Sequence, residues 1–205
     1  MKAKALLLGG LLACTALTAN AQVKKGFRAG ITAGMNVTNI TDMNMDCRIG
    51  FNAGARFEYN FNPNLYLGWG VQWSMKGNMK EVEERGVNVK VKDNAHYLEI
   101  PVNIGGRINL SDDLSLFGET GPYFAVGTCG KIKADATALG QTGSADTDFF
   151  GDNGANRFDA GWGLRAGVEV SSFQIHMGYE YGFTKVWDNT SAHNWNFNVG
   201  VTYMF

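Results

Sequence analysis

The last stretch of the chain, residues 194–205, reads NWNFNVGVTYMF and indicates how the whole protein is built. Its alternate positions are aromatic or β-branched: Trp195, Phe197, Val199, Val201, Tyr203 and Phe205. Successive side chains of a strand point to opposite faces, so the pattern predicts a strand with one apolar and one polar face. A strand that crosses a membrane needs about 9–11 residues, apolar toward lipid, with aromatic residues at both interfaces. The stretch therefore predicts a transmembrane strand rather than a surface strand of a soluble domain.

The first 21 residues have the features of a cleaved export signal. Two lysines precede an apolar stretch, and residues 19–21 (ANA) form a cleavage site of the A-x-A type. We therefore predict a signal peptide over residues 1–21 and one mature domain over residues 22–205. In an alternative interpretation residues 11–14 (LLAC) form a lipoprotein signal that places a lipid on Cys14. Leucine at the second position of that motif makes this alternative the weaker one.

Composition limits the classes of function. The chain has 27 glycines and three prolines. Its formal net charge of −1 does not indicate nucleic-acid binding, which needs a basic patch. After residue 21 no apolar run approaches the roughly 18 residues that a spanning helix needs. The mature chain keeps Cys47 and Cys129, whose pairing stays open, and no cysteine or histidine spacing indicates a metal site. We expect no metal and no cofactor.

Seven further segments show the same alternation, at residues 27–37, 48–60, 65–76, 96–110, 114–127, 157–170 and 173–184. Short and long connections alternate between them. This arrangement predicts an all-β fold, an eight-stranded antiparallel up-and-down transmembrane β-barrel with short periplasmic turns and long outer loops. We expect Phe205, Tyr203 and Trp195 to mark the closing strand and to serve as its assembly signal.

Two local features modify this scheme. Pro101 cannot donate a ladder hydrogen bond, so we expect a bulge or a locally open pairing there. Val87, Val89 and Val91 alternate with polar residues, which predicts that the third and fourth strands extend beyond the membrane as a hairpin. The other long connections, including residues 128–156, are predicted to be loops.

The apolar face is predicted to point outward. An eight-stranded barrel is just wide enough inside for packed side chains or one small ligand. The apolar set contains too many aromatic residues for that space, whereas the other face is rich in glycine with charges between. The volume argument therefore favours a membrane barrel over a soluble one of the lipocalin type.

Three stretches resemble the PorT-like outer-membrane β-barrel family: residues 97–101 (YLEIP), 117–123 (FGETGPY) and 157–169 (RFDAGWGLRAGVE). A small barrel of the OmpA/OmpX type would share the architecture. The resemblance covers nearly the whole mature chain and implies a fold more than an activity. The founding member of the family is associated with protein secretion, a role that we do not transfer to this chain.

Charged residues on the polar face are predicted to form ion pairs inside the barrel, because an unpaired buried charge is costly. Counting across the short turns places Arg107 diagonally from Glu119, and Arg165 diagonally from Glu180, within reach of long side chains. The predicted network comprises Arg107, Glu119, Arg165, Glu180, Glu99, Arg56 and Glu58. An ion-paired plug is favoured over a selective pore, which would need an excess of one sign of charge.

Catalysis and calcium binding are weaker hypotheses. Lipid A-modifying enzymes are also eight-stranded barrels with histidine and serine near the outer leaflet, and His96, His193, Ser74 and Ser191 lie near outer strand ends here. No nucleophile motif surrounds either serine. The acidic residues 146–154 fail the EF-hand pattern.

The sequence thus predicts a non-enzymatic integral barrel of the outer membrane with a structural or interaction role at the cell envelope. The alternatives are a lipid A-modifying enzyme and a narrow pore. Expected partners are outer-membrane lipid and the barrel-assembly machinery, with an envelope or host protein at the outer loops. We expect a monomer.

Overall fold

The computed structural model describes residues 25–84, 87–138, 141–150 and 154–205. The predicted signal peptide and Cys14 lie outside these residues. No helix in the described ranges is long and apolar enough to cross a membrane. The described residues form ten strands: β1 (Gly26–Ile40), β2 (Asp46–Asn62), β3 (Leu65–Lys76), β4 (Asn78–Glu84), β5 (Val87–Asn109), β6 (Leu114–Ala138), β7 (Gln141–Asp148), β8 (Phe158–Val170), β9 (Phe173–Gly182) and β10 (Asn194–Met204).

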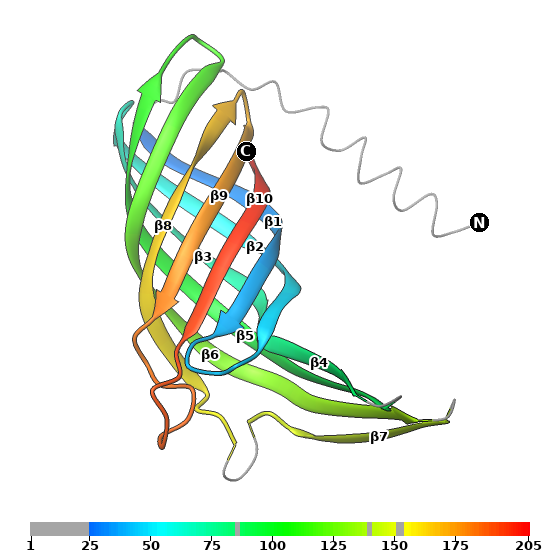
Figure 1. The fold of residues 1–205 in the computed structure, drawn as a ribbon. Helices are drawn as coiled ribbons and strands as arrows, with labels where there is room; N and C mark the ends of the chain where they lie inside the picture. Colours follow the sequence, from blue (N-terminus) through cyan, green and yellow to red (C-terminus); the bar gives the residue numbers. More distant parts are fainter. Residues whose placement is uncertain (1–24, 85–86, 139–140, 151–153) are drawn as a thin grey trace, which may run out of the picture.

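Eight of these strands close into a barrel. Antiparallel pairing runs through β1, β2, β3, β5, β6, β8, β9 and β10, and the ladder between β10 and β1 completes the ring. That ladder extends from Gly30 opposite Met204 to Ile40 opposite Asn194. The predicted eight-stranded antiparallel barrel is confirmed, with β10 as its closing strand (Figure 1). Short turns and the carboxyl terminus lie at one end, and long connections lie at the other.

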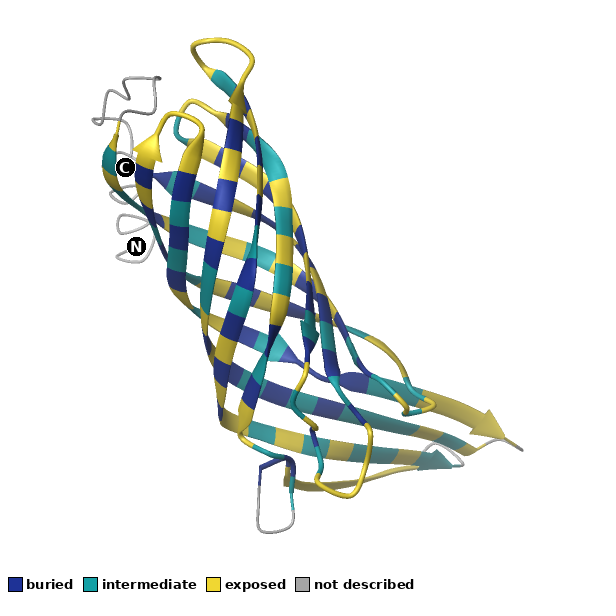
Figure 2. Ribbon diagram, turned by 90° about the vertical axis from the view of Figure 1, so that its left-hand side faces the viewer, coloured by how far each residue is buried: buried dark blue, intermediate teal, exposed yellow. Residues whose placement is uncertain are grey.

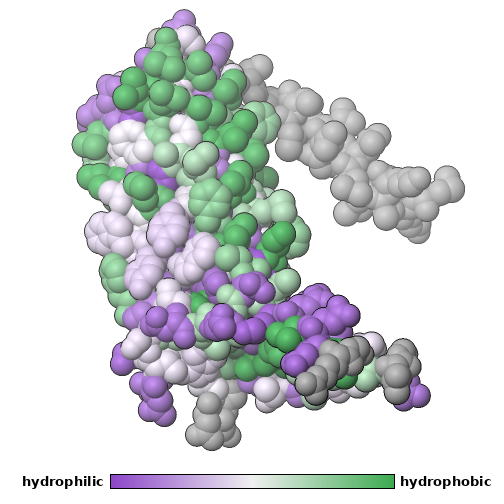
Figure 3. Space-filling view, in the orientation of Figure 1, coloured by the Kyte–Doolittle hydropathy of each residue, from purple (hydrophilic) through white to green (hydrophobic). Residues whose placement is uncertain are grey.

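The two faces of the wall are as predicted. Lipid-facing side chains such as Phe27, Ile108 and Leu164 are 60%, 64% and 60% exposed, whereas Glu58 and Glu99 in the lumen are fully buried. Figure 2 shows this alternation as buried and exposed bands along each strand. Hydrophobic and weakly polar side chains cover much of the wall in Figure 3, and hydrophilic ones gather at the end from which β4 and β7 extend. The apolar side chains of this barrel therefore face lipid, and its polar side chains face the lumen.

The strands at the outer end are longer than predicted. The predicted hairpin beyond the membrane is confirmed, because β4 pairs with the outer part of β5. The prediction of a loop over residues 128–156 is wrong, since β6 continues to Ala138 and pairs with β7. The sequence there lacks apolar alternation, because both faces of β7 are exposed. The outer part of β6 is held by backbone pairing to β5, and β7 by backbone pairing to β6 and by contacts such as Lys131 Nζ–Asp146 Oδ2 (2.5 Å).

Pro101 interrupts the pairing as expected. The β3–β5 register passes from Trp69–Val102 to Gln72–Glu99 without the pairs between them. The only shift of register between β5 and β6 lies elsewhere, at His96 and Tyr97. The open pairing is therefore located at the proline, and the bulge at the point where the barrel wall continues into the outer hairpins.

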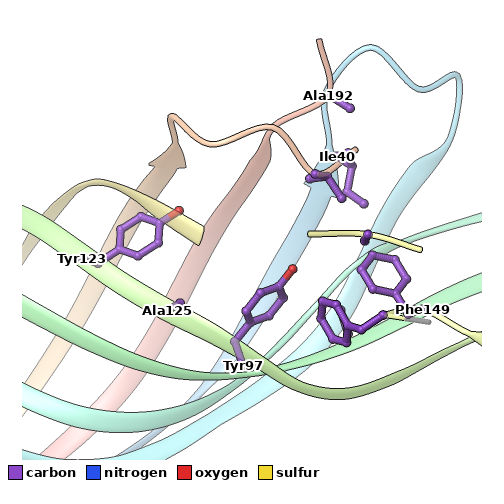
Figure 4. Packing of buried hydrophobic residues seen from close by; sticks show 10 residues of the cluster. Ile40, Tyr97, Tyr123, Ala125, Phe149 and Ala192 are labelled. Atoms are coloured by element: carbon purple, nitrogen blue, oxygen red, sulfur yellow. The ribbon is translucent and has the colours of Figure 1, made fainter. Parts of the chain in front are cut away.

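An apolar cluster fills the outer mouth of the barrel, and we call it the apolar cap. Phe149 is fully buried, and its backbone N–H donates to the carbonyl of Gly130 (3.0 Å). Figure 4 shows this cluster, in which Ile40, Tyr97, Phe149 and Ala192 come from distant parts of the chain. The buried members are Ile40, Ala95, Tyr97, Tyr123, Ala125, Phe149, Phe150, Ala155, Val186 and Ala192. Outer connections thus fold back over the lumen.

The arrangement of the two ends predicts a labelling pattern. After both exposed native cysteines, Cys47 and Cys129, are replaced by serine, a cysteine at Gly143 should react with a membrane-impermeant maleimide on intact cells. A cysteine at Ser172, in the short β8–β9 turn, should react only after the outer membrane is permeabilised. Labelling of Ser172→Cys on intact cells would show that the barrel is inserted the other way round.

Candidate functional site

The lumen holds three groups of charged side chains, stacked along the barrel. The inner group lies near the short turns and centres on Arg107. Its Nη2 contacts Glu58 Oε2 and Glu169 Oε2, both at 3.0 Å, and Arg28 Nη1 lies 2.9 Å from Glu169 Oε1. Gln174 Nε2 donates to both carboxylates at 2.9 Å. The two glutamates are therefore bridged by arginines and by one amide.

The middle group centres on Glu119, which is 2% exposed. Its carboxylate pairs with Arg56 and, at 3.1 Å, with Arg165 Nη1. The Tyr66 hydroxyl donates to it at 2.9 Å, and Asn103 Nδ2 at 3.1 Å. Four donors from four different strands thus satisfy one carboxylate, which is the arrangement that a buried ion pair requires.

The outer group centres on the ammonium of Lys76, which is 1% exposed. Its Nζ lies 2.7 Å from Glu99 Oε2, 3.5 Å from Asp159 Oδ2 and 4.0 Å from Glu180 Oε2. It also lies 4.3 Å from the ring centroid of Tyr123, whose hydroxyl donates to Asp159 at 3.2 Å. The aromatic face and three carboxylates together replace the water that the ammonium loses.

Charges of both signs are nearly balanced over the three groups. Arg28, Arg56, Lys76, Arg107 and Arg165 face Glu58, Glu99, Glu119, Asp159, Glu169 and Glu180. Arg56 Nη2 also lies 3.5 Å from Glu58 Oε1, which links the inner and middle groups. The seven lumen residues predicted from the sequence all take part in this network.

The specific partners differ from the predicted ones. Glu119 is indeed diagonal to Arg107, and Glu180 to Arg165, in the observed registers. Nevertheless Arg165 pairs with Glu119, which is directly opposite it on β6, and a direct neighbour is closer than a diagonal one. Arg107 lies against the ring of Tyr66 and reaches across the lumen to Glu58 and Glu169. The two predicted pairs, Arg107–Glu119 and Arg165–Glu180, are therefore wrong.

Two further arginines, Arg48 and Arg157, lie at the outer edge of the lumen and not in this network. Arg48 Nη1 donates to the carbonyls of Lys76 (3.2 Å) and Asp93 (3.0 Å). Arg157 is exposed and donates to the carbonyl of Gly127 at 2.9 Å. Burial raises the pKa of the Asp93 carboxyl, beyond the membrane-spanning part of β5, to about 6. Backbone carbonyls hold both guanidinium groups at this edge, and alternation alone does not predict these contacts.

Sequence reasoning missed the neutral partners of the ions. Tyr66, Asn103 and Gln174 lie at polar-face positions and complete the hydrogen bonding of the carboxylates. His176 Nδ1 lies 3.0 Å from Arg165 Nη2. Their positions on the polar face of the strands could have indicated this role, because a buried ion pair needs further hydrogen bonds from side chains on the same face.

The residues considered for catalysis do not form a nucleophile–base pair in the described part of the chain. His96 stacks on Trp73 with ring centroids 5.1 Å apart, and His193 stacks on Tyr181 at 5.9 Å. Ser74 is buried and accepts a hydrogen bond from Asn36 at 3.1 Å. No cluster of three metal-ligating side chains occurs among the described residues. Cys47 and Cys129 are free and exposed.

The observed pairs predict the outcome of two double-mutant cycles. Arg165→Ala and Glu119→Ala should each lower the free energy of unfolding by roughly 3–5 kcal/mol, because each leaves a buried charge without its partner. The double variant should lose less than the sum, since residues in contact couple. The matched cycle of Arg165→Ala with Glu180→Ala should be nearly additive. Urea titration of the folded barrel in detergent measures the coupling energy in both cycles. A larger coupling energy for Arg165 with Glu180 than for Arg165 with Glu119 would support the diagonal pair instead.

The chain also resembles known proteins. Residues 20–188 match the family described as outer membrane protein beta-barrel domain. No curated protein matches the chain. Ail, the attachment invasion locus protein of Yersinia pestis, is 21% identical, with 88% of this chain and 99% of that chain covered and a TM-score of 0.38.

Two further solved structures are similar over most of their length. Neisserial surface protein A is 13% identical, covers 88% of this chain and 98% of that chain, and has a TM-score of 0.47. OprG of Pseudomonas aeruginosa is 12% identical, covers 90% of this chain and 98% of that chain, and has a TM-score of 0.46. The family match spans most of the sequence, and the strands close into a barrel with an apolar outer wall. This protein therefore belongs to the outer membrane protein β-barrel domain family and is an integral barrel of the outer membrane.

Proposed function

We propose that this protein is a closed, non-conducting and non-enzymatic barrel whose role at the cell envelope is carried by its outer end. The observation that carries the proposal is the filling of the lumen. The cavity between the ion-paired groups, lined by Arg56, Arg165 and Glu180 among others, has a volume of about 50 Å³. That space can hold only a few water molecules.

The chemistry of the lumen supports closure rather than conduction. A selective pore needs ions to bind weakly and to leave, and rings of one sign of charge serve that purpose. Here each arginine is held by carboxylates of the protein itself. The apolar cap covers the outer mouth above them, with Phe149 fully buried. An ion that passes through the barrel would have to displace both the apolar cap and the ion-paired side chains of the lumen.

The outer end provides a surface for partners. β4, β7 and the outer parts of β5 and β6 form a four-stranded outer sheet that projects from the barrel (Figure 1). β7 ends the sheet order and pairs only with β6 among the described strands, so it presents a free edge, and all its residues are exposed. Unpaired strand edges bind extended segments of other proteins through the backbone. We infer that an envelope or host protein binds here.

Several finer expectations belong to the same proposal. The motifs at residues 97–101 and 117–123 favour the PorT-like branch of the family. Export through cleavage of residues 1–21, insertion by the barrel-assembly machinery, and a monomeric barrel in outer-membrane lipid complete it. The lipid A composition of a deletion strain tests the non-enzymatic part, and it should be unchanged.

Planar bilayer recordings test closure. The wild-type barrel should give no steady conductance above that of the protein-free bilayer. Phe149→Ala, which opens the apolar cap, should also stay silent, because the three charged groups still fill the lumen beneath it. A large, stable and ion-selective conductance from the wild type would overturn the closed barrel in favour of a pore.

The terminal strand provides a test of assembly. Phe205 follows β10 and its backbone N–H donates to the carbonyl of Ala29 at 2.8 Å. Tyr203 packs edge-on against its ring, and Trp195 lies at the other end of the strand. Phe205→Asp should reduce the heat-modifiable, folded fraction in outer membranes, because a charge replaces the lipid-facing aromatic side chain. Phe183→Asp, an exposed aromatic outside the closing strand, is the matched control, and equal losses would argue against a special role for the terminus.

A further inference from the structure

The apolar wall ends sharply on β5 and β6. Leu98 and Val126 are the last apolar residues of their lipid-facing rows and are 45% and 53% exposed. The next residue of that row on β5 is His96, whose ring stacks on Trp73. Aromatic side chains of this kind mark the interface between hydrocarbon and headgroups. The surface immediately beyond them therefore lies at headgroup level.

A pocket opens at this level, on the outside of the barrel. It has a volume of about 750 Å³ and lies between the outer parts of β5 and β6 and the segment that leads into β8. We call it the wall pocket, and its charged and ionisable side chains are His96, Lys131, Lys133, Asp148 and Arg157. Its size is within the range of small-molecule sites. Three permanent cations face one carboxylate, which makes the wall pocket cationic.

Arg157 is held rigidly without a carboxylate. Its Nη1 donates to the carbonyls of Gly127 (2.9 Å) and Thr128 (3.2 Å), and its Nη2 to that of Phe150 (3.3 Å). The guanidinium also lies 5.2 Å from the ring centroid of Phe150. These neutral partners fix the position of the guanidinium and leave its charge uncompensated. Such an arginine is well suited to bind a phosphate.

Lys133 is a second cation of the wall pocket that forms no ion pair with another described residue. It stands opposite Lys92 in the β5–β6 register and opposite Asp146 in the β6–β7 register. The Asp146 carboxylate contacts Lys131 Nζ at 2.5 Å, so this one carboxylate serves two lysines. The charge of Lys133 is therefore only partly compensated within the protein, and it can attract an anion bound beside Arg157.

We propose that the wall pocket binds the phosphate-bearing, anionic headgroup of an outer-leaflet lipid. A lipid is favoured over a free anion because the lining residues His96 and Thr128 lie two residues beyond Leu98 and Val126, the last apolar residues of the lipid-facing wall. The stacked pair of Trp73 and His96 marks the depth at which the headgroup begins. This inference goes beyond the proposed function and does not depend on closure of the lumen.

A native cysteine makes the proposal testable. Cys129 lines the wall pocket and is exposed, and exposed Cys47 lies on β2, outside the pocket lining, as an internal reference. The purified full-length barrel in a nonionic detergent is treated with a maleimide, and modification of each cysteine is followed by peptide mass spectrometry. Dioctanoyl phosphatidic acid should slow modification of Cys129 at least severalfold and leave Cys47 unaffected. Dioctanoyl phosphatidylcholine, with the same chains and no net charge, should protect neither.

Charge variants connect the protection to the named cations. Lys133→Gln should weaken the protection of Cys129 by about tenfold in lipid concentration, because a hydrogen bond to a charged group contributes an energy of that order. Lys185→Gln, an exposed lysine of another outer connection, removes the same charge outside the pocket and should leave protection unchanged. Lys133 is exposed and outside the barrel network, so its loss should not affect folding.

Three results would overturn the proposal. One is the absence of protection by phosphatidic acid. Another is equal protection by inorganic phosphate alone at the same concentration, which would assign the pocket to a free anion. The third is equal loss of protection in Lys133→Gln and Lys185→Gln, which would reduce the effect to the overall charge of the outer surface. Protection by phosphatidic acid that depends on Lys133 and not on Lys185 would support a lipid headgroup site.

Discussion

The need to pair every backbone group within lipid determines the rest of this structure. No water is available in the hydrocarbon layer, so a sheet that crosses it must have no free edge. The ladder between β1 and β10 removes the last edge, and it joins the first described strand to the end of the chain. Because this contact spans nearly the whole sequence, the barrel is complete only when all eight strands are present. The terminal aromatic stretch forms the strand that completes this ring.

Closure with eight strands leaves a lumen that is narrow, and the narrowness explains the charged network. Side chains from opposite walls meet at the axis, so Arg107 on β5 reaches Glu58 on β2 and Glu169 on β8. In so small a space a charge cannot remain hydrated and must find a partner. Glycine on the same face leaves room for these long side chains. At Gly68, for example, an added Cβ would lie 2.3 Å from Arg56 Nη2.

The outer end of the barrel is surrounded by water, so lipid does not constrain its strands. Strands there need no apolar face, and β7 is exposed along its whole length. Beyond the ring, β4, β7 and the outer parts of β5 and β6 form a sheet whose free edge is β7. The junction between the two regimes contains both the bulge at His96 and the wall pocket. A barrel in lipid and a sheet in water meet at this level, and a cationic surface at that depth faces the lipid headgroups.

Alternation with a period of two was sufficient to predict the barrel. It gave all eight strands, with β3 correct to the residue, and the outward direction of the apolar face followed from the volume of the lumen. It also placed the seven predicted charges inside. The alternation of apolar and polar residues does not predict strands that are polar on both faces, so the sequence analysis missed β7 and the outer part of β6. It also indicated nothing about the apolar cap, whose residues come from connections without a period.

Ion-pair partners were decided by the tertiary structure alone. Counting along the chain gives the register of neighbouring strands, and the register was right. Side chains in a lumen choose among partners from every wall, and only the closed ring brings Glu58, Arg107 and Glu169 together. The same holds for the wall pocket, where Arg157 is turned out of the lumen by backbone carbonyls. Sequence period thus determined which face each residue occupies, and closure in three dimensions determined what it touches.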